Sequence, residues 1–321
     1  MIVNCNKINN NLSDNLYINK LLKDSFFLDI ETTGLSRKFS MIISITVMLY
    51  IDNNFKIYQL FCENKTDEKE ILKYLKDLIN DKNFVITYNG NSFDIPFLIG
   101  KYLQNEITFD FNKYIKIDLY NDMRHVRNKI QIENLKLKTV ERYFNIKRED
   151  AISGQDVTVL YEAYKIDPKK EFSFLILQHN YKDVYNLSML FNNIFSLYDE
   201  TLFYNGLIVK INYTDFSIKK NTLYGKFYII SKFKADYIHP SLNFDLKLNS
   251  QDQILDIQIS VGFYKDEKVK EFYYIDNNDF NINTYTAIKG IKNNLIPIKI
   301  NDKFYTQNII NITKKILDSL F

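Results

Sequence analysis

The chain has 321 residues, a length typical of one large domain or of two smaller ones. Hydrophobic residues make up 46% and charged residues 25%, a composition that excludes a disordered chain. The net charge of +3 is too small to indicate a nucleic-acid-binding protein that acts through bulk charge. Residues 201–321 carry 16 Lys and Arg against 12 Asp and Glu, whereas residues 1–200 carry 26 against 27. If the first part handles nucleic acid, it therefore needs local lysines or bound cations.

Cysteine usage and hydropathy bear on the compartment. The two cysteines, Cys5 and Cys62, form no paired motif, which favours a reducing compartment and no zinc site. The first residues lack a basic segment followed by an apolar one, so no signal peptide is expected. The longest apolar run, residues 41–51, is too short and too polar to span a bilayer. We therefore expect a cytoplasmic protein that does not associate with membranes.

The first part of the chain alternates strands and helices. Residues 1–22 are rich in Asn and weakly patterned, which predicts a short N-terminal leader. The run "FFLDI" (26–30) predicts a buried strand, and residues 41–51 and 55–61, joined by "DNN", predict a hairpin beside it. Apolar residues at helical spacing over 67–81 predict a helix.

Two further strands and a set of helices complete this region. Short apolar runs at 84–88 and 114–120 predict strands, and "DIPFLIGKYLQNE" between them predicts a helix that tolerates Pro96 in its first turn. From about 120 to 198 the apolar spacing is helical. This order predicts an α/β domain over residues 23–200, with a mixed five-stranded sheet flanked by helices.

The pattern changes near residue 201. Segments such as "LIVKINY", "FDLKLN" and "ILDIQISVGFY" alternate like half-exposed antiparallel strands, and residues 305–320 form a last amphipathic helix. We therefore predict a second, α+β domain over residues 201–321, with a mainly antiparallel sheet and an unknown role.

The strand at 26–30 continues into an unusual pair of acids in "FFLDIETTGLS". Asp29 and Glu31 lie two positions apart, so both point to the same face of the strand. Adjacent carboxylates repel each other and resist burial, so the fold gains nothing from this placement. Their position therefore indicates a function.

Two other acids occur in similarly apolar contexts. Asp94 follows a buried strand at the start of a helix, and Asp183 lies inside an apolar helical region. Divalent magnesium or manganese prefers carboxylate oxygen and cancels the repulsion among such acids. Two ions about 3.5–4 Å apart can activate water and stabilise the leaving oxygen of a phosphodiester. We therefore interpret Asp29, Glu31, Asp94 and Asp183 as one metal site.

The segments that carry these acids resemble a known family. In this order, "LDIETTGL", "NGNSFD" and "HNYKD" resemble the three exonuclease motifs of the DEDD 3′–5′ exonucleases, which have a ribonuclease H-like fold. Together with "LKLKTVERYFNIKREDAISGQD", they are most similar to the bacterial YprB-like group of ribonuclease H-like proteins. The resemblance covers roughly residues 23–200. It implies a metal-dependent exonuclease that uses two Mg²⁺ or Mn²⁺ ions on single-stranded 3′ ends of DNA or RNA.

The resemblance also implies roles for individual residues. It makes the four acids metal ligands, with Glu31 helping to position the attacking water. Phe93, in the second motif, is expected near a base. The further residues expected to hold the substrate are Thr32, Thr33, Gly34, Leu35, Asn89 and Asn180.

The third motif departs from the family pattern. Family members read Tyr-x-x-x-Asp or His-x-x-x-x-Asp, whereas this chain has His179 four residues before Asp183. A separation of four puts both on one helix face, so His179 can reach the site. Two roles stay open for it: to deprotonate water, or only to orient water with Asn180.

Other readings of the sequence remain. A non-catalytic nucleic-acid-binding module, or a structure-selective endonuclease of the same fold class, would retain much of this pattern. Asp118, near a strand end, is interpreted as a structural or substrate-side residue and not as a fifth ligand. The basic segment "KLKTVERYFNIKRED" is interpreted as a solvated helix face.

Overall fold

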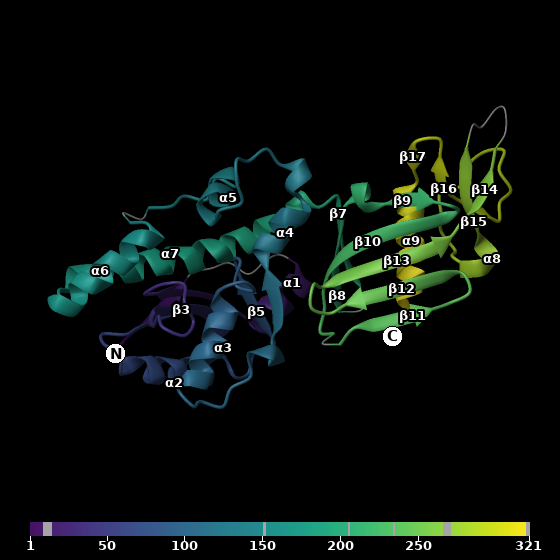
Figure 1. Cartoon of the computed structure of the whole chain (residues 1–321). Helices are drawn as coiled ribbons and strands as arrows, with labels where there is room; N and C mark the ends of the chain where they lie inside the picture. The colour runs from purple at the N-terminus through teal and green to yellow at the C-terminus, as the bar shows by residue number, and fades with distance from the viewer. Residues whose placement is uncertain (9–14, 150–151, 205, 234, 266–270, 319–321) are drawn as a thin grey trace. The chain divides into compact units, whose positions relative to one another are not determined.

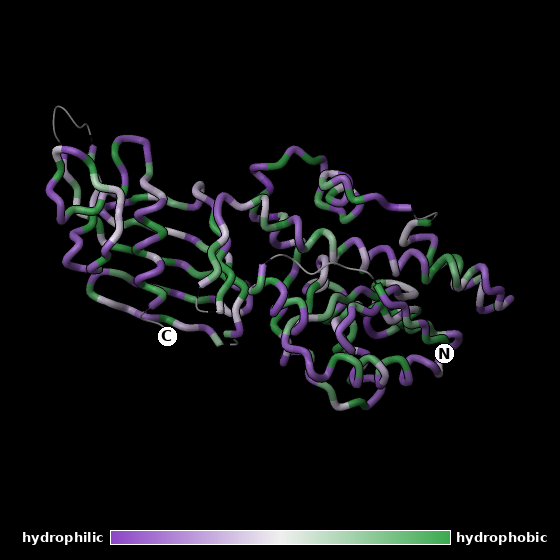
Figure 2. The backbone as a smooth tube through the Cα atoms, turned by 180° about the vertical axis from the view of Figure 1, so that it is seen from behind, coloured by the Kyte–Doolittle hydropathy of each residue, from purple (hydrophilic) through white to green (hydrophobic). Residues whose placement is uncertain are grey.

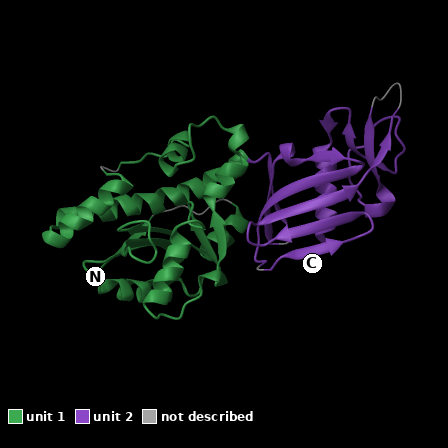
Figure 3. Cartoon of the chain, in the orientation of Figure 1, with its two compact units in different colours: residues 1–197 green, residues 198–321 purple. Residues whose placement is uncertain are grey.

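A computed structural model describes residues 1–8, 15–149, 152–204, 206–233, 235–265 and 271–318. The chain forms two compact units, Met1–Leu197 and Tyr198–Phe321 (Figure 3). Parts of three sequence predictions lie outside the described residues: 9–14 of the expected leader, 150–151 of the segment that resembles the YprB-like group, and 319–320 of the last helix.

Unit 1 is built on one mixed sheet of six strands in the order β1-β4-β3-β2-β5-β6. β2 pairs antiparallel with β3 and parallel with β5, and β5 and β6 are also parallel. The change from antiparallel to parallel pairing thus occurs at β2, the strand that carries the first acidic pair. The strands are β1 (Ile2–Ile8), β2 (Ser25–Thr32), β3 (Ile42–Ile51), β4 (Asn54–Phe61), β5 (Phe84–Thr87) and β6 (Ile115–Asp118).

The N-terminal segment departs from the prediction. The sheet has six strands and not five, because Ile2–Ile8 pairs with β4 as an edge strand. Residues 16–23 form helix α1 (Leu16–Lys23). An edge strand exposes most of its side chains, and in β1 Asn4, Asn6 and Lys7 interrupt the apolar run that would reveal a buried strand.

Helices cover both faces of the sheet (Figure 1). Leu28 and Ile30 of β2 lie in a core with apolar residues of α2 (Asp67–Ile79) and α3 (Asp94–Gln104). On the opposite face, α6 (Gly154–Ile166) and the long α7 (Lys170–Ile194) pack against β3 and β4. Two shorter helices, α4 (Leu119–His125) and α5 (Leu137–Tyr143), connect β6 to α6.

Unit 2 has an antiparallel sheet of seven strands and a second sheet of four. Polar and apolar residues alternate along β13 (Ile254–Ser260), and Figure 2 shows a similar alternation of hydropathy along strands of this unit. The seven-stranded sheet contains β7 (Glu200–Tyr204), β8 (Leu207–Ile211), β9 (Ser217–Lys219), β10 (Thr222–Ile230), β11 (Tyr237–Pro240), β12 (Phe244–Asn249) and β13 (Ile254–Ser260). The smaller sheet contains β14 (Gly262–Tyr264), β15 (Phe272–Asp276), β16 (Leu295–Ile300) and β17 (Lys303–Phe304), and α8 (Asn277–Phe280) follows β15.

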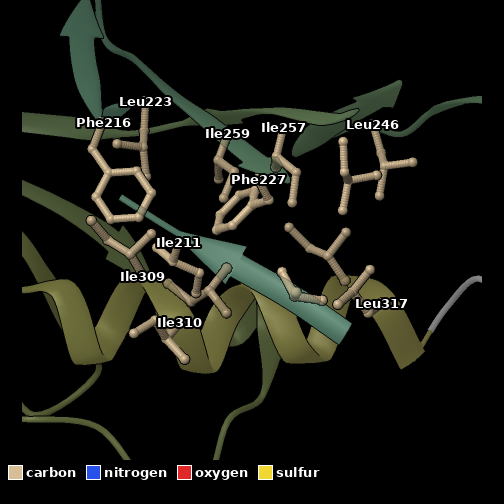
Figure 4. Close-up of a cluster of buried hydrophobic side chains, with 14 of the residues drawn as sticks. Ile211, Phe216, Leu223, Phe227, Leu246, Ile257, Ile259, Ile309, Ile310 and Leu317 are labelled. Atoms are coloured by element: carbon tan, nitrogen blue, oxygen red, sulfur yellow. The ribbon is translucent and has the colours of Figure 1, made fainter. Parts of the chain in front are cut away.

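The core of unit 2 lies between its strands and helix α9 (Thr306–Asp318). Ile309 and Leu317 of α9 face apolar strand residues such as Phe227 and Ile257 (Figure 4). The predicted α/β class, with a mixed ribonuclease H-like sheet followed by an antiparallel one, is confirmed. Among the described residues, no helix is long and apolar enough to cross a membrane.

Candidate active site

Strand β2 presents its two acids to the face covered by α7. Phe27, on the same face, contacts Phe191 of α7 edge-on, with 6.0 Å between ring centroids. Asp29 Oδ2 accepts a hydrogen bond of 2.5 Å from Asn180 Nδ2, also on α7. Because side chains alternate along a strand, Asp29 and Glu31 point toward α7, whereas Leu28 and Ile30 enter the opposite core.

Asp94 reaches the same place from the start of α3. Its side chain is buried, and its Oδ1 accepts a hydrogen bond of 3.1 Å from the backbone N–H of Ile30. Ile30 is the residue between the two acids of β2. This bond therefore ties the second acidic motif to the first through the main chain of β2.

Helix α7 supplies the remaining two groups. His179 Nε2 lies 3.6 Å from Glu31 Oε1 and 3.6 Å from Asp183 Oδ2. Ligand atoms of these three residues all lie within 4.8 Å of one another, an arrangement that could hold a metal ion. The spacing of four residues does place His179 and Asp183 on one face of the helix.

Three of the grouped acids have raised pKa values. Burial, followed by the charges of Asp183 and Asp94, raises the pKa of both Asp29 and Glu31 well above the usual range. Burial is also the main cause that raises the pKa of Asp94 to about 7. Burial and the neighbouring negative charges thus oppose the ionisation of Asp29, Glu31 and Asp94.

The sequence that forms this arrangement matches a known protein family. The family model RNase_H_2, of the RNase_H superfamily, matches residues 26–195, more than half of the chain. The chain belongs to the RNase H superfamily. The match includes all four acids and His179.

Individual relatives match parts of this RNase H-like chain. The DNA polymerases of the Autographa californica and Bombyx mori nuclear polyhedrosis viruses are each 23% identical over 115 residues, which cover 28% of the chain and 12% of the polymerase. The family B DNA polymerase of Pyrobaculum calidifontis matches 54% of the chain and 25% of its own, with 15% identity and a TM-score of 0.43. The EXO domain of Aedes aegypti Nibbler matches 56% of the chain and 81% of its own, with 15% identity and a TM-score of 0.38.

Asn180, which the sequence predicts to contact substrate, lies buried against β2 and β3 of the RNase H-like domain. Its side chain is fully buried, and its Oδ1 accepts hydrogen bonds from Ser44 Oγ (3.0 Å) and Thr46 Oγ1 (2.6 Å) of β3. Its Nδ2 donates to Asp29, as described above. Because these bonds use both ends of the amide, Asn180 orients Asp29 and is not exposed to substrate.

Arg148 and Glu141 form a part of the site that the sequence did not reveal. Arg148 NH1 lies 2.5 Å from Asp183 Oδ1 and 3.1 Å from Glu141 Oε1. Both side chains are buried, so this part of "KLKTVERYFNIKRED" is not the solvated helix face that was expected. The segment carries many charges, and its sequence gives no signal to separate these two from their exposed neighbours.

The predicted substrate loop follows β2 directly. Thr32 Oγ1 donates to the carbonyl of Gly34, and Thr33 exchanges hydrogen bonds with the backbone of Met41. A Cβ on Gly34 would lie 2.9 Å from Ser40 Oγ, so the loop has little room for a side chain there. Leu35 is 84% exposed at its tip. These contacts fix the loop and leave Leu35 open to solvent.

The second motif lies on a turn that Asp118 holds. Asp118 accepts hydrogen bonds from the backbone N–H groups of Asn89 (2.7 Å), Asn91 (3.0 Å) and Tyr120 (3.1 Å). It caps α4 and fixes this turn, which is the structural role considered for it. Asn89 is exposed with φ of 62°, and Phe93 is half-buried against the ring of Phe97.

Proposed function

We propose that the chain is a metal-dependent 3′–5′ exonuclease of the DEDD type, close to the YprB-like group. It hydrolyses phosphodiester bonds at single-stranded ends of DNA or RNA and releases nucleoside monophosphates. One observation carries the proposal: four acids from three distant segments gather at the central strand, where burial and neighbouring negative charges raise the pKa of Asp29, Glu31 and Asp94. A fold gains no stability from such a cluster, so its use lies in binding cations.

The donor set fits divalent magnesium or manganese. Asp29, Glu31, Asp94 and Asp183 would hold the ions, because hard cations prefer carboxylate oxygen. Two bound cations supply an activated water and stabilise the leaving oxygen of the phosphodiester. The nearly neutral charge of residues 1–200 agrees with this assignment, since the ions bring positive charge to the phosphate.

The side chains around the acids have distinct tasks in this proposal. Asn180 and the N–H of Ile30 hold Asp29 and Asp94 in place before metal binds. His179, beside Glu31 and Asp183, accepts a proton from the attacking water or orients that water. The loop Thr32–Leu35 holds the terminal nucleotide, with Leu35 against its base. Asn89 and Phe93 border the same end of the substrate.

The proposal is tested with a 5′-labelled single-stranded oligonucleotide and a titration of Mg²⁺ or Mn²⁺. We expect metal-dependent shortening from the 3′ end by the wild type, and none by Asp29→Ala. Shortening that survives this substitution contradicts the site assignment. Arg142→Gln, at an exposed position of α5, is a matched control that should keep full activity.

Further substrates and a binding measurement separate the alternative functions. A circular single strand stays intact with an exonuclease and is cut by an endonuclease of the same fold class. Binding of the linear oligonucleotide without shortening, at every metal concentration, would instead indicate a non-catalytic binding module. Matched DNA and RNA oligonucleotides then decide which sugar the site accepts.

A further inference from the structure

The guanidinium of Arg148 joins three side chains at the edge of the acidic cluster. NH1 lies 2.5 Å from Asp183 Oδ1 and also donates to both carboxylate oxygens of Glu141, at 3.1 and 3.3 Å. NH2 lies 3.4 Å from His179 Nδ1. One planar group thus contacts both functional residues that α7 contributes, which lie one helical turn apart.

Glu141 holds this guanidinium through both of its carboxylate oxygens. Its side chain is 1% exposed and accepts a hydrogen bond of 3.1 Å from Asn186 Nδ2 on α7. Burial raises the pKa of Glu141, while the neighbouring Arg148 opposes that rise. A series of hydrogen bonds and ion pairs therefore runs from Asn186 of α7 to Glu141 of α5, from there to Arg148, and back to Asp183 of α7.

The cost of this arrangement indicates a role beyond stability. Taking an arginine and two carboxylates out of water costs free energy that their attraction repays only in part, and apolar residues of similar size often do as well. Arginine differs from lysine here because its rigid fork can fix the orientation of a carboxylate. With Oδ1 of Asp183 held by NH1, its Oδ2 lies on the side of His179.

We propose that Arg148, held by Glu141, is a positioning residue that sets the orientation of Asp183 and His179 before metal binds. The inference rests on the proposed function, because it assigns Asp183 to the metal site and His179 to the attacking water. In this assignment Arg148 acts through Asp183 and His179, the two side chains that it contacts. It acts as the outer partners of metal ligands commonly do, and removal of such partners costs roughly 10–100-fold in metal affinity or activity.

The test compares Arg148→Lys and Arg148→Ala with the exposed control Arg142→Gln. Lysine keeps the charge and loses the fork, so we expect Arg148→Lys to lower kcat about tenfold or more at saturating Mn²⁺, with KM for the oligonucleotide within about threefold of wild type. Millimolar guanidinium should restore part of the activity of Arg148→Ala. A wild-type kcat in Arg148→Lys overturns the proposal, as does a rise in KM that accounts for the whole loss.

Binding of Mn²⁺ alone, measured by calorimetry, judges the inference without any nuclease assay. Arg148→Ala should bind Mn²⁺ about tenfold more weakly than the wild type, because Asp183 is no longer preset. Unchanged or tighter binding overturns the inference, since Arg148 would then be neutral or a competitor of the cation. If the wild type binds Mn²⁺ but shortens no oligonucleotide, the proposed function fails while this comparison still stands. Arg148→Lys, which retains the buried charge, provides the same comparison if Arg148→Ala does not fold.

Discussion

The buried Asn308 of unit 2 and the acidic cluster of unit 1 are polar groups placed in opposite ways. In unit 2, Asn308 of α9 is fully buried, yet its amide accepts from Thr286 N (2.7 Å) and donates to the carbonyls of Thr286 (3.2 Å) and Pro297 (2.8 Å). In unit 1, Asp29, Glu31 and Asp94 lie together, and burial with mutual repulsion raises their pKa values.

This difference separates polar groups that maintain a fold from those that serve a site. A neutral amide whose hydrogen bonds are all made stabilises its surroundings, whereas clustered carboxylates destabilise the chain that holds them. Substitution should therefore have opposite effects in the two units: loss of stability without loss of activity in unit 2, and the reverse at the acids of unit 1.

The largest expected effect follows Asp29→Asn. The substitution removes one charge of the cluster, so metal-dependent shortening should fall about a thousandfold or more, the scale at which loss of an electrostatic catalytic group is felt. In EDTA the same variant should have a free energy of unfolding about 1 kcal/mol higher than the wild type, because the repulsion among the acids is relieved. Activity assays and urea unfolding on one preparation check both. A variant that loses activity and stability together would contradict the contrast between the units.

The next effect concerns pH and Asp94. Its folded pKa of about 7 exceeds the ordinary value of 3.8, so the folded chain binds this proton more tightly than the unfolded chain. The resulting stabilisation is fully present below about pH 4 and is lost as the pH rises through 7. Without metal, the wild type should lose up to about 4 kcal/mol relative to Asp94→Asn between pH 4 and 8. Urea unfolding in EDTA across this range measures the difference, and parallel curves for the two proteins would refute it.

A smaller effect is expected in unit 2. Asn308→Ala leaves the N–H of Thr286 and the carbonyl of Pro297 without their side-chain partner, which should cost about 1–3 kcal/mol in the free energy of unfolding. The nuclease kcat should not change. Denaturant unfolding and a nuclease assay on the folded variant test both halves, and a drop in kcat at full folding would show that this network serves the site as well.

The smallest effect concerns Leu35. Since the side chain is 84% exposed, Leu35→Ala should leave the unfolding midpoint unchanged. If Leu35 contacts the terminal base, KM for a single-stranded oligonucleotide should rise about threefold, equivalent to under 1 kcal/mol of lost apolar contact. Steady-state kinetics measure this change, with Ser36→Ala on the same exposed loop as the control. Equal KM values for all three proteins would remove Leu35 from the substrate site.

The acids themselves were accessible from sequence because each conflicts with its neighbours. Asp29 and Glu31 interrupt an apolar strand, and Asp183 interrupts an apolar helix face, so the local pattern singles out these positions, while their role as metal ligands stays a prediction. Arg148 and Glu141 show no such conflict, because charges in a charged segment look solvated. Strand β1 was not predicted for a related reason: its pairing comes from β4, and most of its own side chains are exposed and follow no buried pattern. The local sequence pattern holds no information on pairing between segments far apart in the chain.

The hydrogen bond from Ile30 N–H to Asp94 has a consequence for how the site can change over time. Its donor belongs to the main chain, so every residue except proline supplies it at position 30. The link between the first two acidic motifs is therefore nearly immune to point mutation at this position. Isoleucine, valine or leucine can be exchanged here to suit the core, while the spacing of the acids is inherited unchanged.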